Sequence, residues 1–97
     1  MAIPFDTIRL DIKEKRINRI NQLFDYGTIS EWKDATGFRK GVIESLLEDS
    51  KRFQFRHIFK IADNSGIKES TIRRLVQGQK SYNFIAKRLA RKKDLPE

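Results

Sequence analysis

The chain has 97 residues, a net charge of +8 and no cysteine. The lack of cysteine excludes a disulfide scaffold and a cysteine-ligated zinc site, and the single histidine, His57, which we expect on the surface, cannot form a multi-histidine metal site. No apolar run approaches the ~20 residues that span a bilayer, and no nucleophile–base pair or carboxylate pair stands out. We therefore expect one domain over residues 1–97 that is neither membrane-embedded nor an enzyme and needs no metal, cofactor or small-molecule ligand.

The positive charge is concentrated in the second half of the chain. Residues 1–49 hold 8 Lys and Arg against 9 Asp and Glu, whereas residues 50–97 hold 13 against 4. A concentrated basic surface is typical of a protein that binds nucleic acid. Charge alone also fits a solvated surface or a face for acidic lipid.

The N-terminal third is compatible with two secondary structures. Residues 8–12 alternate as a strand would, and a lone strand would need a partner strand, which hints at a dimer. The same residues also fit the first turns of a long helix. Residues 14–26 fit a helix that ends at Gly27, with an apolar face formed by Ile17, Ile20, Leu23 and Phe24.

Glycines separate the helices that follow. Thr28 and Glu31 form a capping box, which predicts a helix over 29–36 that ends at Gly37. A second helix is expected over 40–49.

The basic half contains three further predicted helices. One covers 54–64 and ends before Gly66, and the next covers 69–77 and stops at Gly78, a good C-terminal cap residue. The last helix covers 82–93. Its expected inward residues are Phe84, Ile85 and Leu89.

The chain also contains an internal repeat with a period of 29 residues. The segment 32–55 aligns with 61–84 without a gap. Six pairs are identical: Asp34/Asp63, Gly37/Gly66, Ile43/Ile72, Leu46/Leu75, Lys51/Lys80 and Phe55/Phe84. Such a period predicts an all-α fold of five to six short helices with two tandem helix-turn-helix units. Residues 14–53 would hold an N-terminal helix and the first, degenerate unit, and residues 54–93 the second unit with a basic C-terminal helix. Chance similarity between two helical hairpins is the alternative.

The residues around Gly66 have the spacing of a helix-turn-helix. Ala62 is small where the second helix crosses, Gly66 permits a positive φ, and apolar residues such as Ile72 and Leu75 seal the crossing. The remaining face of the second helix is polar and suits the major groove of DNA. Its residues, the predicted base contacts, are Lys68, Glu69, Ser70, Arg73, Arg74 and Gln77.

The stretch SGIKESTIRRLVQGQKSYNFIAKRLA resembles the helix-turn-helix of the lambda-repressor/Cro-like (XRE-type) DNA-binding family. The resemblance covers about residues 55–90 and implies a compact helical fold, binding to specific DNA, frequent dimers and a role in transcription control. The matching residues are Ala62, Gly66, Ile67, Thr71, Ile72, Leu75, Gly78, Ile85, Ala86 and Leu89.

The same resemblance implies a loop after Gly78 that touches phosphate. The chain departs from the family at Lys68, because the family often has a small hydroxyl residue at that position. The basic last helix offers further phosphate contacts or only a frayed, solvated tail. The predicted phosphate contacts are Gln79, Lys80, Ser81, Asn83, Lys87 and Arg91.

The first copy of the repeat is expected to bind DNA less well. Its outer face carries Glu44 and Glu48, which would repel phosphate, and Gly41 weakens its helix. Arg39 and Lys40 at the start of that helix remain secondary candidates for DNA contact.

These patterns predict a protein that binds specific double-stranded DNA, as a transcriptional regulator or an accessory factor of a mobile element. The expected location is the cytoplasm, or the nucleoid in a bacterium or phage-infected cell, and a homodimer is left open. Two alternatives remain: a protein-binding anti-repressor or inhibitor module on the same scaffold, and an RNA-binding protein that uses the basic half.

Overall fold

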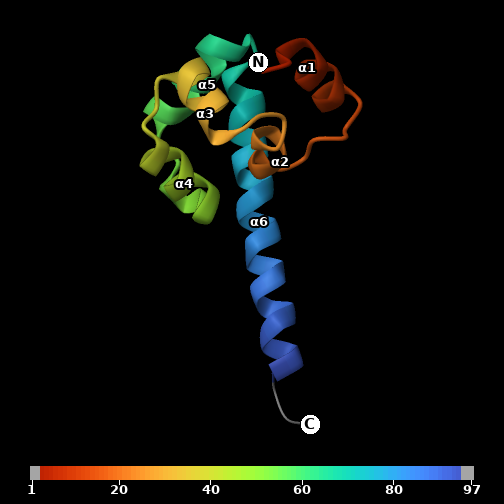
Figure 1. The fold of residues 1–97 in the computed structure, drawn as a ribbon. Helices are drawn as coiled ribbons and strands as arrows, with labels where there is room; N and C mark the ends of the chain where they lie inside the picture. Colours follow the sequence, from red (N-terminus) through yellow and green to blue (C-terminus); the bar gives the residue numbers. More distant parts are fainter. Residues whose placement is uncertain (1–2, 95–97) are drawn as a thin grey trace.

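The computed structural model describes the backbone of residues 3–94 and the side chains of residues 3–90. Within these residues every regular element is helical, so the predicted all-α fold is confirmed. Figure 1 shows α6 as a central rod, with α3 and α4 on one side and α1 and α2 on the other. The elements are α1 (Phe5–Lys13), α2 (Ile20–Phe24), α3 (Ile29–Thr36), α4 (Lys40–Glu48), the 3-10 turn η1 (Ser50–Arg52), α5 (Phe55–Ser65) and α6 (Glu69–Asp94).

The N-terminal segment forms a helix, so the strand considered for residues 8–12 is wrong. Ile8 and Ile12 are buried and lie four residues apart, whereas Leu10 between them is exposed. This four-residue spacing places the two isoleucines on one face of α1.

The helix predicted over 14–26 is shorter than expected, because only α2 forms within it. The chain leaves α1 at Lys15, whose φ of +62° is a left-handed conformation, and the Arg16 amide donates to the Asp11 carbonyl at 2.8 Å. The apolar residues of this segment nevertheless reach the core from the turn and from α2. The buried set is Ile17, Ile20, Leu23 and Phe24.

The first helical hairpin, formed by α3 and α4, agrees closely with the sequence-based prediction. The Glu31 amide donates to the Thr28 hydroxyl at 3.1 Å, and the Thr28 amide donates to the Glu31 carboxylate at 2.9 Å. This capping box satisfies two amides that the first turn of α3 would otherwise leave unpaired.

The two hairpins turn in the same way. Gly37 ends α3 with φ and ψ of +77° and +4°, and Gly66 ends α5 with +73° and +8°. Each glycine amide donates to the carbonyl four residues earlier, at 2.8 Å for Gly37 and 3.0 Å for Gly66. Both turns therefore need the left-handed conformation that glycine adopts without steric cost.

The residue before each glycine also has the same role in both hairpins. The Thr36 hydroxyl accepts from the Phe38 amide at 3.2 Å, and the Ser65 hydroxyl accepts from the Ile67 amide at 3.1 Å. Thr36 and Ser65 are both buried. Each hydroxyl thus satisfies an amide inside the turn, where water does not reach it.

The repeat also places equivalent apolar residues in one shared core. Ile43 and Leu46 of α4, and their counterparts Ile72 and Leu75 of α6, are all less than 2% exposed. Trp32 of α3 lies in the same cluster, and its indole N–H donates to the Phe24 carbonyl at 3.0 Å. The predicted inward positions of these four repeat residues are therefore confirmed.

His57 is buried rather than on the surface, so its expected position is wrong. Its side chain is 5% exposed and packs edge-on against Phe38 and Phe53. Its Nδ1 accepts from the Gln54 amide at 3.0 Å and so caps the start of α5. Burial, with the charge of Arg56 as a smaller cause, lowers the pKa of His57 below its usual value.

The helix break predicted at Gly78 is wrong, because α6 continues through it to Asp94. A Cβ atom at Gly78 would lie 2.3 Å from the carbonyl oxygen of Asn18. The glycine therefore allows the segment before α2 to approach the backbone of α6. The loop expected over residues 78–81 and the separate helix over 82–93 do not form.

Candidate nucleic-acid interface

The start of α6 presents a polar outer face opposite the core. Ile72, Leu75 and Val76 are buried on its inner side. The six residues predicted to contact bases do not belong to this buried side. Glu69 is half-buried, and the other five are exposed. The exposed members are Lys68, Ser70, Arg73, Arg74 and Gln77.

Two arginines with different surroundings lie side by side on this face. Arg73 has a side chain 52% exposed and forms an ion pair of 2.9 Å with Glu69, one turn earlier. Arg74 is exposed. Arginine is suited to DNA because its planar guanidinium donates two parallel hydrogen bonds to a guanine edge or a phosphate.

Gln79 is not available for the predicted phosphate contact. Its side chain is 4% exposed, its Oε1 accepts from the Asn21 amide at 3.3 Å, and its Nε2 donates to Asn83 Oδ1 at 2.8 Å. Asn83 in turn donates to the Ser50 hydroxyl at 3.4 Å. This network joins α2, α6 and η1. The side chains of Gln79 and Asn83 therefore hold these elements together.

The other predicted phosphate contacts follow α6 outward. Lys80 is half-buried, whereas Ser81 and Lys87 are exposed. The side chain of Arg91 lies outside the residues whose side chains are described. These residues therefore belong to a helix rather than to a loop.

The far half of α6 exposes the apolar residues that were expected to point inward. Phe84 is 63% exposed, and Ile85 and Leu89 are each 56% exposed. Because α6 does not turn at Gly78, its last residues project beyond the other helices instead of folding back (Figure 1).

The first hairpin offers a weaker second surface. Arg39 and Lys40, which the sequence suggested as secondary DNA contacts, are exposed at the start of α4. Lys40 lies 3.7 Å from Glu44 on the next turn. This carboxylate reduces the positive charge of the surface, and Glu48 lies one turn further along the same helix.

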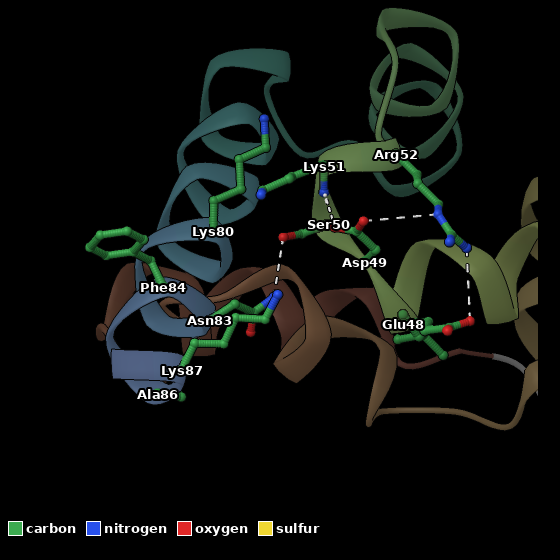
Figure 2. A pocket seen from close by; sticks show the side chains of 11 residues that line it. Glu48, Asp49, Ser50, Lys51, Arg52, Lys80, Asn83, Phe84, Ala86 and Lys87 are labelled. Carbon is green, nitrogen blue, oxygen red and sulfur yellow. Dashed lines mark hydrogen bonds and ion pairs between the residues drawn. The ribbon is translucent and has the colours of Figure 1, made fainter. Parts of the chain in front are cut away.

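A cleft of about 480 Å³ opens between the α4–η1 segment and α6. Figure 2 shows Lys51 of η1 facing Lys80 of α6 across it, with Phe84 at its edge. Lys51 is not among the residues that the sequence predicted to contact nucleic acid. The available signal was its identity with Lys80 in the internal repeat.

Comparison with protein families, curated proteins and solved structures found no match to this chain. In the described part of the chain, none of the helices combines the length and apolarity required to cross a bilayer.

Proposed function

We propose that this chain binds specific sequences of double-stranded DNA and reads them with residues 68–77. The observation that carries the proposal is the exposed position of Arg73 and Arg74, on the side of α6 opposite the buried Ile72 and Leu75. A helix held in this way fits the major groove, which is about 12 Å wide. Its arginines would contact guanine edges, and Ser70 and Gln77 would contact neighbouring bases.

The charge of the second half would supply affinity that does not depend on sequence. Residues 50–97 carry 13 Lys and Arg against 4 Asp and Glu. Neutralising phosphates releases counterions, so binding should weaken steeply as the salt concentration rises.

The biological role that fits this activity is control of transcription or assistance to a mobile element. The resemblance to lambda-repressor/Cro-like proteins supports this role, as well as binding as a homodimer. A protein of this kind would act where the cellular DNA is, in the cytoplasm or at the nucleoid.

A protein partner is the second candidate, favoured by the exposed apolar residues of the far half of α6. Ile85 and Leu89 lie four residues apart on one side of the helix. An anti-repressor or inhibitor would use such a face against another protein. It would then bind DNA weakly and without sequence preference.

The test is fluorescence anisotropy with a duplex selected from random sequence. Arg73→Ala and Arg74→Ala should each weaken binding to the selected duplex by about 1–3 kcal/mol. Arg73→Lys and Arg74→Lys are the matched controls, because they keep the charge and lose the bidentate geometry. They should lose affinity for the selected duplex and keep affinity for unrelated DNA.

Unchanged affinity in both alanine variants would reject α6 as the reading helix. Competition with duplex RNA and with single strands, at two salt concentrations, tests the RNA alternative. Preference for duplex RNA over the selected DNA would overturn the proposal.

A further inference from the structure

The cleft beside α6 gathers lysines from two parts of the chain. Lys51 comes from η1, and Lys80 and Lys87 lie two turns apart on one side of α6. The polar groups between them are Ser50 and Asn83, which are joined by a hydrogen bond of 3.4 Å (Figure 2). The cleft is therefore lined by cations around a small polar patch.

The positive charge of these lysines is not balanced within the described residues. Among residues 3–90, no carboxylate oxygen lies within 4.0 Å of the ammonium group of Lys51, Lys80 or Lys87. The two acidic residues of the cleft face Arg52 instead, at 3.8 Å for Glu48 and 4.0 Å for Asp49.

Asp49 is further occupied by the backbone, because its carboxylate accepts from the Lys51 amide at 3.0 Å. Four cations thus share the cleft with two carboxylates, and the three lysines attract an anion.

The cleft continues the outer face of the proposed reading segment. The residues of this stripe are spaced alternately by four and three positions, which keeps them on one side of a helix. They are Arg73, Gln77, Lys80, Phe84 and Lys87.

The length of α6 indicates what would lie in the cleft when the reading segment is in the groove. Arg73 and Phe84 are eleven residues apart, which is about 16 Å along a helix. This exceeds the width of the major groove, about 12 Å. If α6 crosses the groove with Arg73 at a base, the cleft lies at the wall of the groove, where the sugar–phosphate backbone runs.

We propose that this cleft binds a backbone phosphate of the DNA strand that borders the groove, and this inference rests on the proposed function. The ammonium groups of Lys51, Lys80 and Lys87 surround the phosphate. Phe84, 63% exposed at the mouth, packs against the adjoining sugar. Lys51 thereby gives the first repeat copy a role in DNA binding.

The experiment compares two triple variants that lose the same charge. The cleft variant changes Lys51, Lys80 and Lys87 to Gln. The control variant changes Lys13, Lys33 and Lys60 to Gln, and these three lysines are exposed and lie outside the cleft. The cleft variant should bind selected and unrelated duplexes roughly tenfold more weakly than the control variant at the same salt concentration. Its slope of log affinity against log salt should be smaller by about 1.

Pyrophosphate provides a probe that does not depend on DNA recognition. In the wild-type protein, NMR titration with inorganic pyrophosphate should shift the amide signals of Lys51 and Asn83, and the cleft variant should lose these shifts. Duplex binding that is equal in the two triple variants would overturn the phosphate site. Pyrophosphate shifts in a protein that binds no duplex would instead overturn the proposed function and leave the anion site standing.

Discussion

The carbonyl oxygen of Asn18 lies directly against Gly78, in the middle of α6. A Cβ atom added to Gly78 would meet this oxygen at 2.3 Å, and backbone atoms cannot move aside as the end of a side chain can. This contact joins the segment before α2 to the central helix. It explains a glycine inside a helix, where that residue normally lowers stability.

We predict that Gly78→Ala lowers the free energy of unfolding by about 1–2 kcal/mol, since the steric cost of overpacking exceeds the gain in helix propensity. Gly41→Ala in α4 is the matched control, because nothing lies within 4 Å of its added Cβ. It should stabilise the protein by about 0.5–1 kcal/mol. Urea denaturation of both variants measures the difference.

A third variant distinguishes two reasons for a glycine at position 78: the close approach of the Asn18 carbonyl and a helix C-cap. Asparagine tolerates the left-handed conformation of a cap residue but is larger than alanine. Gly78→Asn should therefore destabilise the protein more than Gly78→Ala does. A milder effect of asparagine would instead support the helix end that the sequence had predicted at this position.

The two turn glycines provide a quantitative test of the internal repeat. Gly37→Ala and Gly66→Ala should each lower the free energy of unfolding by about 1–2 kcal/mol, because both residues have φ near +75°. Asparagine at either position should cost less. Equal losses in urea denaturation are expected, and a large loss at one glycine alone would show that the turns differ energetically.

The hairpins could be predicted from the sequence because their signals are local. The capping box of Thr28 and Glu31 lies within four residues, and each turn depends on one glycine and its neighbours. The burial of Ile72 and Leu75 follows from their spacing on one helix. For the same reason, the exposed position of Arg73 could be predicted.

The course of α6 could not be predicted, because it depends on a contact between residues far apart in the sequence. Nothing near Gly78 indicates that Asn18 packs against it. Without that knowledge, a glycine before a polar stretch resembles a helix end. The loss of Gln79 from the predicted interface has the same cause, because its hydrogen bond to Asn21 also comes from the N-terminal segment.

The projecting half of α6 predicts an unusual tolerance to polar substitution. Ile85→Gln and Leu89→Gln should change the free energy of unfolding by less than about 0.5 kcal/mol, since both side chains are largely exposed. Leu75→Ala, on the buried side of the same helix, should cost about 2–5 kcal/mol. Chemical denaturation gives all three values, and a loss above 2 kcal/mol at Ile85 or Leu89 would indicate that the helix folds back.

The buried His57 predicts a loss of stability in mildly acidic solution. Its pKa is lowered in the folded protein, so the folded state binds fewer protons than the unfolded state, whose histidine pKa is about 6.5. Its contribution to stability is therefore complete above pH 6.5 and decreases as the pH falls below that value. The free energy of unfolding should change with pH by no more than about 1.4 kcal/mol per pH unit, which is the limit for one proton.

His57→Gln is the control for this pH dependence, because glutamine retains an oxygen that can accept from the Gln54 amide without titrating. Stability measured between pH 7.5 and 5 should be nearly constant in this variant. Asp11 and Glu31 also have lowered pKa values, held down chiefly by hydrogen bonds from Tyr26 and from the Thr28 amide. Their contributions are lost only at more acidic pH, as the pH falls through and below the usual carboxylate range.

The ion pair between Glu69 and Arg73 leads to a prediction about DNA binding. Glu69 holds the Arg73 guanidinium at 2.9 Å in the free protein and adds a negative charge beside the proposed reading face. Glu69→Gln removes the repulsion between this carboxylate and phosphate and releases Arg73. Affinity for unrelated duplexes should rise several-fold, with a steeper dependence on salt.

Glu44→Gln is the matched control, because Glu44 forms the corresponding ion pair with Lys40 in the first hairpin. If the second hairpin is the one that contacts DNA, this change should raise affinity much less than Glu69→Gln does. Anisotropy titrations of both variants against one unrelated duplex at two salt concentrations provide the comparison. A larger gain from Glu44→Gln would transfer the main DNA contact to α4, where Arg39 and Lys40 are exposed at the start of the helix.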